Sequence, residues 1–231
     1  MNPGGDNSFV FNSGGPFNRW IAEIEPVFKR LWDTLICRCP DLRELSILTQ
    51  GPDPIDARIL FAGDHWPNLR LLELGNMSVG PAVINDEDTY PFISFLSERN
   101  CLRALRLSGD FTLPSIHFAR LPRDSLQDLR CFCGTIDHLS SLPSAKSLLS
   151  VEISNPLVLR EVTPLAISQA LQAAPAVRSL KVSFVLQSGY DGFGILRSIA
   201  TAGAHIKHLD LTFSHKPSFY LVCRFGYSNV Y

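Results

Sequence analysis

The sequence predicts an α/β fold in which short parallel strands stack side by side, with helices between them, as a repeat solenoid. A six-residue phrase, apolar-x-x-apolar-x-apolar, occurs seven times at intervals of 22 to 33 residues, and a period of that length is typical of solenoids. Segments with helical character separate the phrases, and strands that alternate with helices pair in parallel. Hydrophobic residues make up 45% of the 231, which is enough for a continuous core.

Residues 1–16 are rich in Gly, Asn and Ser and have no hydrophobic periodicity, which predicts a flexible leader. The repeat domain is expected over 17–214. It begins with a helical cap at 17–38, where apolar residues recur at helical spacing and would cover the first repeat. Pro26 is expected to kink or break that helix, because proline cannot donate the helical hydrogen bond.

The seven phrases predict seven strands. They read LRELSI (42–47), LRLLEL (69–74), LRALRL (102–107), LQDLRC (126–131), LLSVEI (148–153), VRSLKV (177–182) and IKHLDL (206–211). Side chains alternate along a strand, so the fourth and sixth residues point into the core and the first lies at its entry. In the fourth phrase this places Cys131 in the core.

Helices are expected between the strands. Their ranges are 55–62, 91–98, 115–121, 135–142, 164–173 and 194–202. Pro91 and Pro164 stand early in their helices, with Thr163 as an N-cap. Residues 215–231 carry aromatic residues but no further phrase, and we interpret them as an irregular tail, a truncated repeat.

The phrases resemble leucine-rich repeats. The range from about 28 to 218 is similar to the leucine-rich part of fungal F-box proteins, notably those of basidiomycetes, in LWDTLICRCPDLREL (31–45), GTIDHLSSLP (134–143), REVTPLAISQALQ (160–172), GYDGFGILRSI (189–199) and HKPSF (215–219). The resemblance implies an irregular leucine-rich-repeat solenoid, a curved parallel sheet of about seven strands with helices on its convex side.

As to function, the resemblance implies the substrate-recognition part of an F-box ubiquitin-ligase receptor. The sequence contains no F-box motif, so binding of the Skp adaptor is expected only if an F-box lies outside this chain. The alternative is a stand-alone leucine-rich-repeat scaffold for interaction or immune-type recognition, with no ubiquitin role.

Two sets of outward-facing residues are candidates for partner binding on the concave face. The second residues of the phrases are Arg43, Arg70, Arg103, Gln127, Leu149, Arg178 and Lys207. A stripe of one sign gains nothing from its own neighbours, which favours an acidic protein partner. The other interpretation is that these arginines pack their stems on the turn before the strand.

The fifth residues of the phrases alternate in charge. They are Ser46, Glu73, Arg106, Arg130, Glu152, Lys181 and Asp210. Strands lie about 4.8 Å apart, so neighbouring members can form ion pairs. We therefore expect this set mainly to neutralise itself through surface pairs of small energy, although the same residues could form a charged recognition surface.

No catalytic, metal or cofactor site is predicted. The cysteine pairs Cys37/Cys39 and Cys131/Cys133 have C-x-C spacing, not the C-x-x-C spacing usual for zinc, and packing explains them better. A net charge of −1 gives no general attraction to nucleic acid or to an anionic membrane. The sequence lacks a signal peptide and a membrane-spanning run, so a cytoplasmic or nuclear location with reduced thiols is expected.

Overall fold

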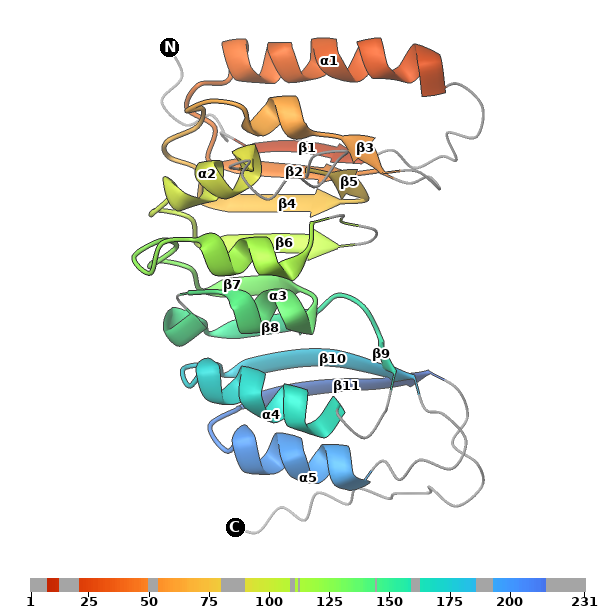
Figure 1. Cartoon of the computed structure of the whole chain (residues 1–231), viewed down its shortest axis with the longest axis vertical. Coiled ribbons are helices and arrows are strands. Elements are labelled where there is room, and N and C mark those ends of the chain that lie inside the picture. Colours follow the sequence, from red (N-terminus) through yellow and green to blue (C-terminus); the bar gives the residue numbers. More distant parts are fainter. Residues whose placement is uncertain are drawn as a thin grey trace.

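Strands and helices alternate through the computed structural model of the chain (Figure 1). The structure describes residues 8–12, 21–49, 54–79, 90–108, 111, 113–143, 145–158, 163–185 and 193–214. Residues 215–231, for which a truncated repeat is predicted, lie outside the described residues. The fold is α/β, with one long parallel sheet that does not close into a barrel.

Eight strands follow one another across the sheet in chain order, and each pairs in parallel with the next. They are β1 (Ser8–Asn12), β2 (Glu44–Leu48), β4 (Leu71–Gly75), β6 (Ala104–Ser108), β7 (Cys131–Gly134), β8 (Ser150–Ile153), β10 (Ser179–Val185) and β11 (His208–Ser214). The short β9 (Leu157–Val158) also pairs with β10, while β3 (Ile55–Asp56) and β5 (Met77–Ser78) form a separate pair. The predicted parallel sheet is confirmed.

The first strand lies inside the segment for which a flexible leader is predicted, so that prediction is wrong for residues 8–12. Phe9 and Phe11 alternate with exposed residues and pack against the core. The ring of Phe11 meets Phe28 edge-on at 6.1 Å between centroids. Period-two alternation is a strand signal, but the Gly- and Asn-rich flanks obscure it in the sequence.

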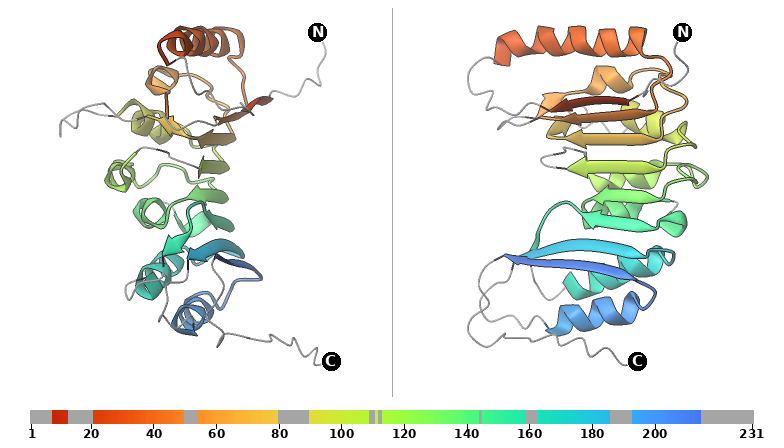
Figure 2. Two further views of the ribbon diagram at one scale, coloured as in Figure 1. Left: turned by 90° about the vertical axis from the view of Figure 1, so that its right-hand side faces the viewer. Right: turned by 180° about the vertical axis from the view of Figure 1, so that it is seen from behind.

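The helices and 3₁₀ turns lie on one face of the sheet, as the left-hand view of Figure 2 shows. They are α1 (Ile21–Arg38), η1 (Arg58–Phe61), α2 (Pro91–Ser97), η2 (Ser115–Arg120), α3 (Ile136–Ser141), η3 (Ala145–Ser147), α4 (Thr163–Ala173) and α5 (Phe193–Ala202). The right-hand view of Figure 2 looks onto the other face, where no helix of the described residues covers the strands.

Most of the helices agree with the predicted ranges, with three differences. The ranges 55–62 and 115–121 contain 3₁₀ turns instead of α-helix. The helix α1 passes through Pro26 without a break. Thr163 begins α4, and its hydroxyl donates to the carbonyl of Val158 at 3.0 Å.

One core runs along the whole sheet between the strands and the helices. At the N-terminal end, α1 covers it with Phe28, Trp32 and Leu35, each at most 6% exposed. Phe28 packs on Trp32 with 5.4 Å between ring centroids. Burial of such rings and of the inward-facing leucines of the strands is the main favourable term in folding.

The fourth strand starts three residues later than the sequence predicts. In the sheet Phe132 stands beside Leu105 and Val151, so the repeated unit is LRCFCG (129–134), not LQDLRC (126–131). Phe132 is the core residue at 2% exposure. Cys131 is half-buried at the third place of the unit, so its predicted core position is wrong.

The frame 126–131 carries Leu126, Leu129 and Cys131 at the first, fourth and sixth places, whereas the observed frame carries Leu129, Phe132 and Gly134, so the sequence pattern favours the wrong frame. Gly134 occupies the sixth place, where the other units have an aliphatic side chain, and an added Cβ there would lie 2.6 Å from Cζ of Phe132. The large ring of Phe132 therefore fills the space of two side chains. Because glycine replaces the apolar residue expected at the sixth place, the sequence pattern does not identify the correct frame.

The same turn precedes each of the seven strands that carry the repeated phrase, from β2 to β11. The N–H of the residue at the first place donates to the carbonyl three residues earlier, at 2.8 to 3.3 Å. The carbonyls belong to Cys39, Trp66, Arg99, Leu126, Ala145, Ala174 and Gly203. Trp66 and Leu126 share positive φ angles of 55° and 57°. Leu126 is thus a turn residue, which supports the corrected frame.

Candidate functional site

A row of basic residues lies along the end of the sheet where the strands begin. The corrected frame moves Arg130 to the second place of its unit and removes Gln127, which lies in the preceding turn. We define the basic row as Arg43, Arg70, Arg103, Arg130, Arg178 and Lys207. Leu149 occupies the remaining second place, between Arg130 and Arg178. The row thus has one more cation than the sequence predicts.

Backbone hydrogen bonds fix the order and spacing of this row. Each second-place N–H donates to the second-place carbonyl of the strand before it, at 2.7 to 2.8 Å. The chain of bonds runs from Arg70 to Arg43 and continues without interruption through Leu149 to Lys207. Neighbouring members are therefore separated by one strand spacing, about 4.8 Å.

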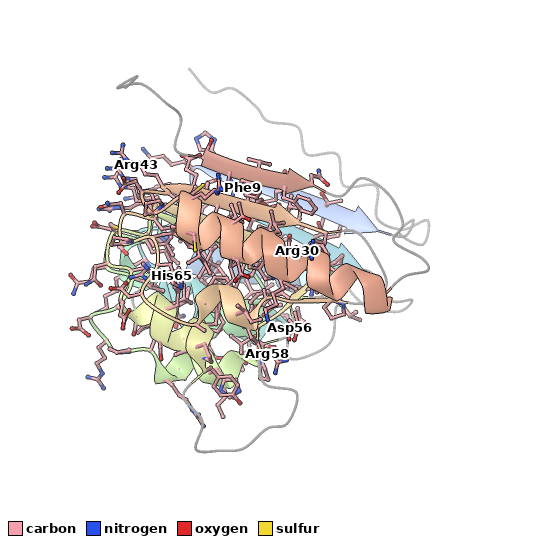
Figure 3. All side chains as sticks on the ribbon, turned by 90° about the horizontal axis from the view of Figure 1, so that it is seen from above. Phe9, Arg30, Arg43, Asp56, Arg58 and His65 are labelled. Carbon is pink, nitrogen blue, oxygen red and sulfur yellow. The ribbon has the colours of Figure 1, made fainter. Side chains whose placement is uncertain are left out.

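The charged groups of the row are exposed to solvent. Among the described residues, none of the six forms an ion pair. Arg178 donates from Nη1 to the carbonyl of His205 at 3.0 Å, and no acid of the described residues pairs with its charge. Viewed along the stack of strands, Arg43 projects at the start of its strand, well away from the Asp56–Arg58 pair (Figure 3).

The fifth places of the units form a second line on the helix-free face, and this line is largely self-neutralised. Glu73 accepts from the Ser46 hydroxyl at 2.6 Å and lies 3.6 Å from Arg106. Lys181 and Glu152 form an ion pair at 2.7 Å, and its hydrogen bond raises the pKa of Lys181. Two of the predicted pairs of opposite charge, Glu73–Arg106 and Glu152–Lys181, are confirmed, and such half-exposed pairs contribute little stability.

Arg130 is not a member of this line, so the predicted pairing of Arg130 with Glu152 is wrong. Cys133 takes its place, between Arg106 and Glu152 on the neighbouring strands. Burial, with a smaller contribution from Glu152, raises the pKa of the Cys133 thiol to about 11. The thiol stays protonated at neutral pH, and the thiolate is the form that acts as a nucleophile or binds metal.

A pocket of about 710 Å³ opens next to the break in the row. It lies between the turns that lead into β7 and β8, and its lining is mixed, with Arg123 and Lys146, small hydroxyl side chains and about as much apolar as polar surface. Gln127 also lines this pocket, which is where the structure places the residue that the sequence had assigned to the row.

The metal-ligating side chains of the described residues are dispersed. No three His, Cys, Asp or Glu side chains gather there as a possible metal site. The described cysteines Cys37, Cys39, Cys101, Cys131 and Cys133 carry free thiols. Of the described helices, none combines the length and the hydropathy needed to cross a lipid bilayer.

Comparisons with protein-family models, with curated protein sequences and with solved structures found nothing that matches this chain. The basic row is therefore the basis on which a function is proposed. Sequence reasoning found Arg43, Arg70, Arg103, Arg178 and Lys207 in their correct places, and it missed that Arg130 belongs with them. The i→i+3 turn before each strand, which places Leu126 with Trp66, is the signal that corrects the frame.

Proposed function

We propose that the chain is an irregular leucine-rich-repeat solenoid that serves as a non-catalytic scaffold for protein–protein recognition, with the basic row as the contact surface for an acidic partner. The observation that carries this proposal is that six exposed cations stand in one line with no ion pair among the described residues. Seven equivalent strands, each preceded by the same turn, support the solenoid.

An acidic partner explains the charge of the row better than stability does. Like charges at neighbouring positions repel, and surface cations without acids contribute no favourable pair. Complementary charge at an interface instead speeds association and excludes wrong partners. The self-neutralised line at the fifth places has no such need of a partner.

The resemblance to F-box proteins assigns the scaffold a role, namely substrate recognition for a ubiquitin ligase. In that role the row would contact the protein to be ubiquitinated, and the Skp adaptor would bind an F-box outside this chain. Co-precipitation of this chain by itself with the Skp adaptor would contradict that division of labour. A ligase-free scaffold is expected to retain its row-dependent partner without any cullin or adaptor in the complex.

The row is tested by reversing two of its charges. Arg43→Glu with Arg103→Glu should reduce capture of the acidic partner from an extract by about tenfold or more, because each new carboxylate repels it. The matched control is Lys29→Glu with Arg197→Glu, which makes the same change in net charge at two exposed helix positions that form no ion pair with the described residues.

Quantitative mass spectrometry of the captured proteins is the measurement, with circular dichroism to confirm that both double variants are folded. The control should retain the same partners as the unmodified chain. If the row variant retains them too, the row is not the contact surface and the proposal is wrong.

A further inference from the structure

The order of charged and apolar residues along the basic row can determine which partner binds it. From β2 to β11 it presents four cations, then Leu149, then two more cations, at seven successive strand starts. Leu149 is 43% exposed. Its backbone keeps the hydrogen bonds of its neighbours, so only the side chain differs at this point. The row is therefore a charged line with a single apolar break.

The spacing of the row discriminates between possible partners. Its six intervals of about 4.8 Å span roughly 29 Å. An α-helix offers a side chain on one face about every 5.4 Å, whereas an extended chain offers one about every 6.7 Å. Over the whole row the helix drifts by about 4 Å, which flexible Arg and Lys stems can absorb, and the extended chain drifts by about 11 Å.

Acids beside the row disfavour a partner with closely spaced charges. Asp41 and Asp128 each stand two residues before a row member, and Glu44 follows Arg43 directly; all three are exposed. A nucleic acid carries a phosphate at every nucleotide and would meet these carboxylates. A helix with one acid per turn can keep its charges on the row alone.

We propose that the occupant of the basic row is a partner α-helix that crosses the strand starts, with one acidic side chain per turn along one face and an apolar side chain at the turn that meets Leu149. This inference rests on the proposed function. The helix would be about 20 residues long, because about 1.5 Å of rise per residue must cover roughly 29 Å.

The experiment uses three fluorescent peptides with the same composition and the full chain. The first has about 22 residues, with Glu at i, i+4, i+7, i+11, i+18 and i+21 and Leu at i+14. In the second the same residues are scrambled so that no acidic face forms. The third keeps the Glu and Leu positions of the first, but two prolines exchange places with interior residues, so that this peptide cannot form a helix. Fluorescence anisotropy gives the Kd, and circular dichroism gives the helicity.

The first peptide is expected to bind about tenfold or more tightly than the other two, and to weaken as salt rises from about 50 to 200 mM. Arg103→Glu and Arg130→Glu should each weaken it by about tenfold, while Arg197→Glu should leave its Kd unchanged.

A charge exchange at the break tests the apolar contact. Leu149→Arg completes the row, and it should favour a peptide with Glu at i+14 over the peptide with Leu there by about fivefold or more, whereas the unmodified chain should prefer Leu. Leu149 is exposed, so this substitution leaves the core intact. The same preference in both proteins would overturn the apolar part of the proposal.

The failure of this inference can be told apart from the failure of the proposed function. Equal binding of the three peptides, still weakened by Arg103→Glu, overturns the helix and leaves the acidic protein partner. If no peptide binds but capture from an extract still depends on the row, the helix is likewise overturned and the acidic protein partner remains. Tighter binding of a single-stranded oligonucleotide of about 20 nucleotides than of the first peptide overturns both.

Discussion

At the scale of single residues, His138 is a buried titratable group whose pKa the fold shifts. Its side chain is 4% exposed, and Nε2 donates to the carbonyl of Leu113 at 2.7 Å. Its Nδ1 is buried and has no hydrogen-bond partner within the described part of the chain. Burial lowers the pKa of His138, while the Leu113 carbonyl and Asp137 act in the opposite direction. The folded protein therefore holds a neutral imidazole.

The stability of the fold should depend on this histidine in a defined pH range. The unfolded chain binds a proton at His138 below about pH 6.5 and the folded chain resists it, so the free energy of unfolding should fall as the pH falls below that value, by at most about 1.4 kcal/mol per pH unit. Chemical denaturation between about pH 7.5 and 5.5 measures it. His138→Gln should flatten the dependence, while His208→Gln, at an exposed strand position, should not. An unchanged slope in His138→Gln would contradict this prediction.

Gly134 is a second residue with a specific role, because Phe132 fills the space above it. Gly134→Ala should cost about 1–3 kcal/mol of unfolding free energy, since the new methyl group would lie 2.6 Å from Cζ of the buried Phe132 ring. Phe132→Leu in the same chain should recover part of the loss. The control is Gly194→Ala, where nothing lies within 4 Å and a gain of about 0.5–1 kcal/mol is expected in a helix. Equal effects at both positions would show that the ring moves aside.

At the scale of elements, the turn that precedes β6 differs most from the other six turns, because it contains Arg99. This arginine is 2% exposed, and its guanidinium lies 4.5 Å from the ring centroid of Phe95. It donates from Nη2 to Asp64 at 2.8 Å and to the carbonyl of His65. The other six turns place an uncharged residue at this point. A buried cation in this turn therefore depends on the partners that surround it.

Removing the acid from this turn should be more costly than removing an acid from an exposed pair. Asp64→Asn leaves the buried charge of Arg99 weakly paired and should cost about 1–3 kcal/mol. Asp56→Asn breaks the exposed Asp56–Arg58 pair and should cost about 1 kcal/mol or less. Arg99→Met should cost less than Asp64→Asn, because no charge then stays buried. Urea denaturation of the three variants measures the differences, and the reverse order would contradict a structural role for the pair.

At the scale of the whole molecule, composition conceals the charge pattern. The chain has 21 Lys and Arg against 22 Asp and Glu, with a net charge of −1. Yet the stacking of units gathers six cations into one line, while opposite charges at the fifth places pair with each other. Near-neutral composition therefore excludes a general attraction to polyanions, but not a local one.

Much of the fold can be predicted from the sequence, because the apolar phrase is both the pattern and the core. Leu45, Leu72, Leu105, Val151 and Leu180 are predicted to point inward, and each is at most 3% exposed. The same prediction is wrong for Leu209, which is 48% exposed on β11, the last strand of the sheet. The helix ranges also follow from local signals such as Pro91 at the first position of α2. Local alternation and helix-start chemistry need no knowledge of distant residues.

The sequence by itself therefore determined the repeat, the parallel order of the strands and five members of the basic row. Only the tertiary structure decided the frame of the fourth unit, and with it the place of Arg130. Leu126 and Leu129 fit the first and fourth places of the predicted frame, and Leu129 also fits the first place of the observed frame. The choice is made by the hydrogen bond from Arg130 to Arg103 and by the Phe132 ring, which packs over Gly134. The hydrogen bond joins Arg130 to a residue of the preceding strand unit, so no local sequence pattern can contain it.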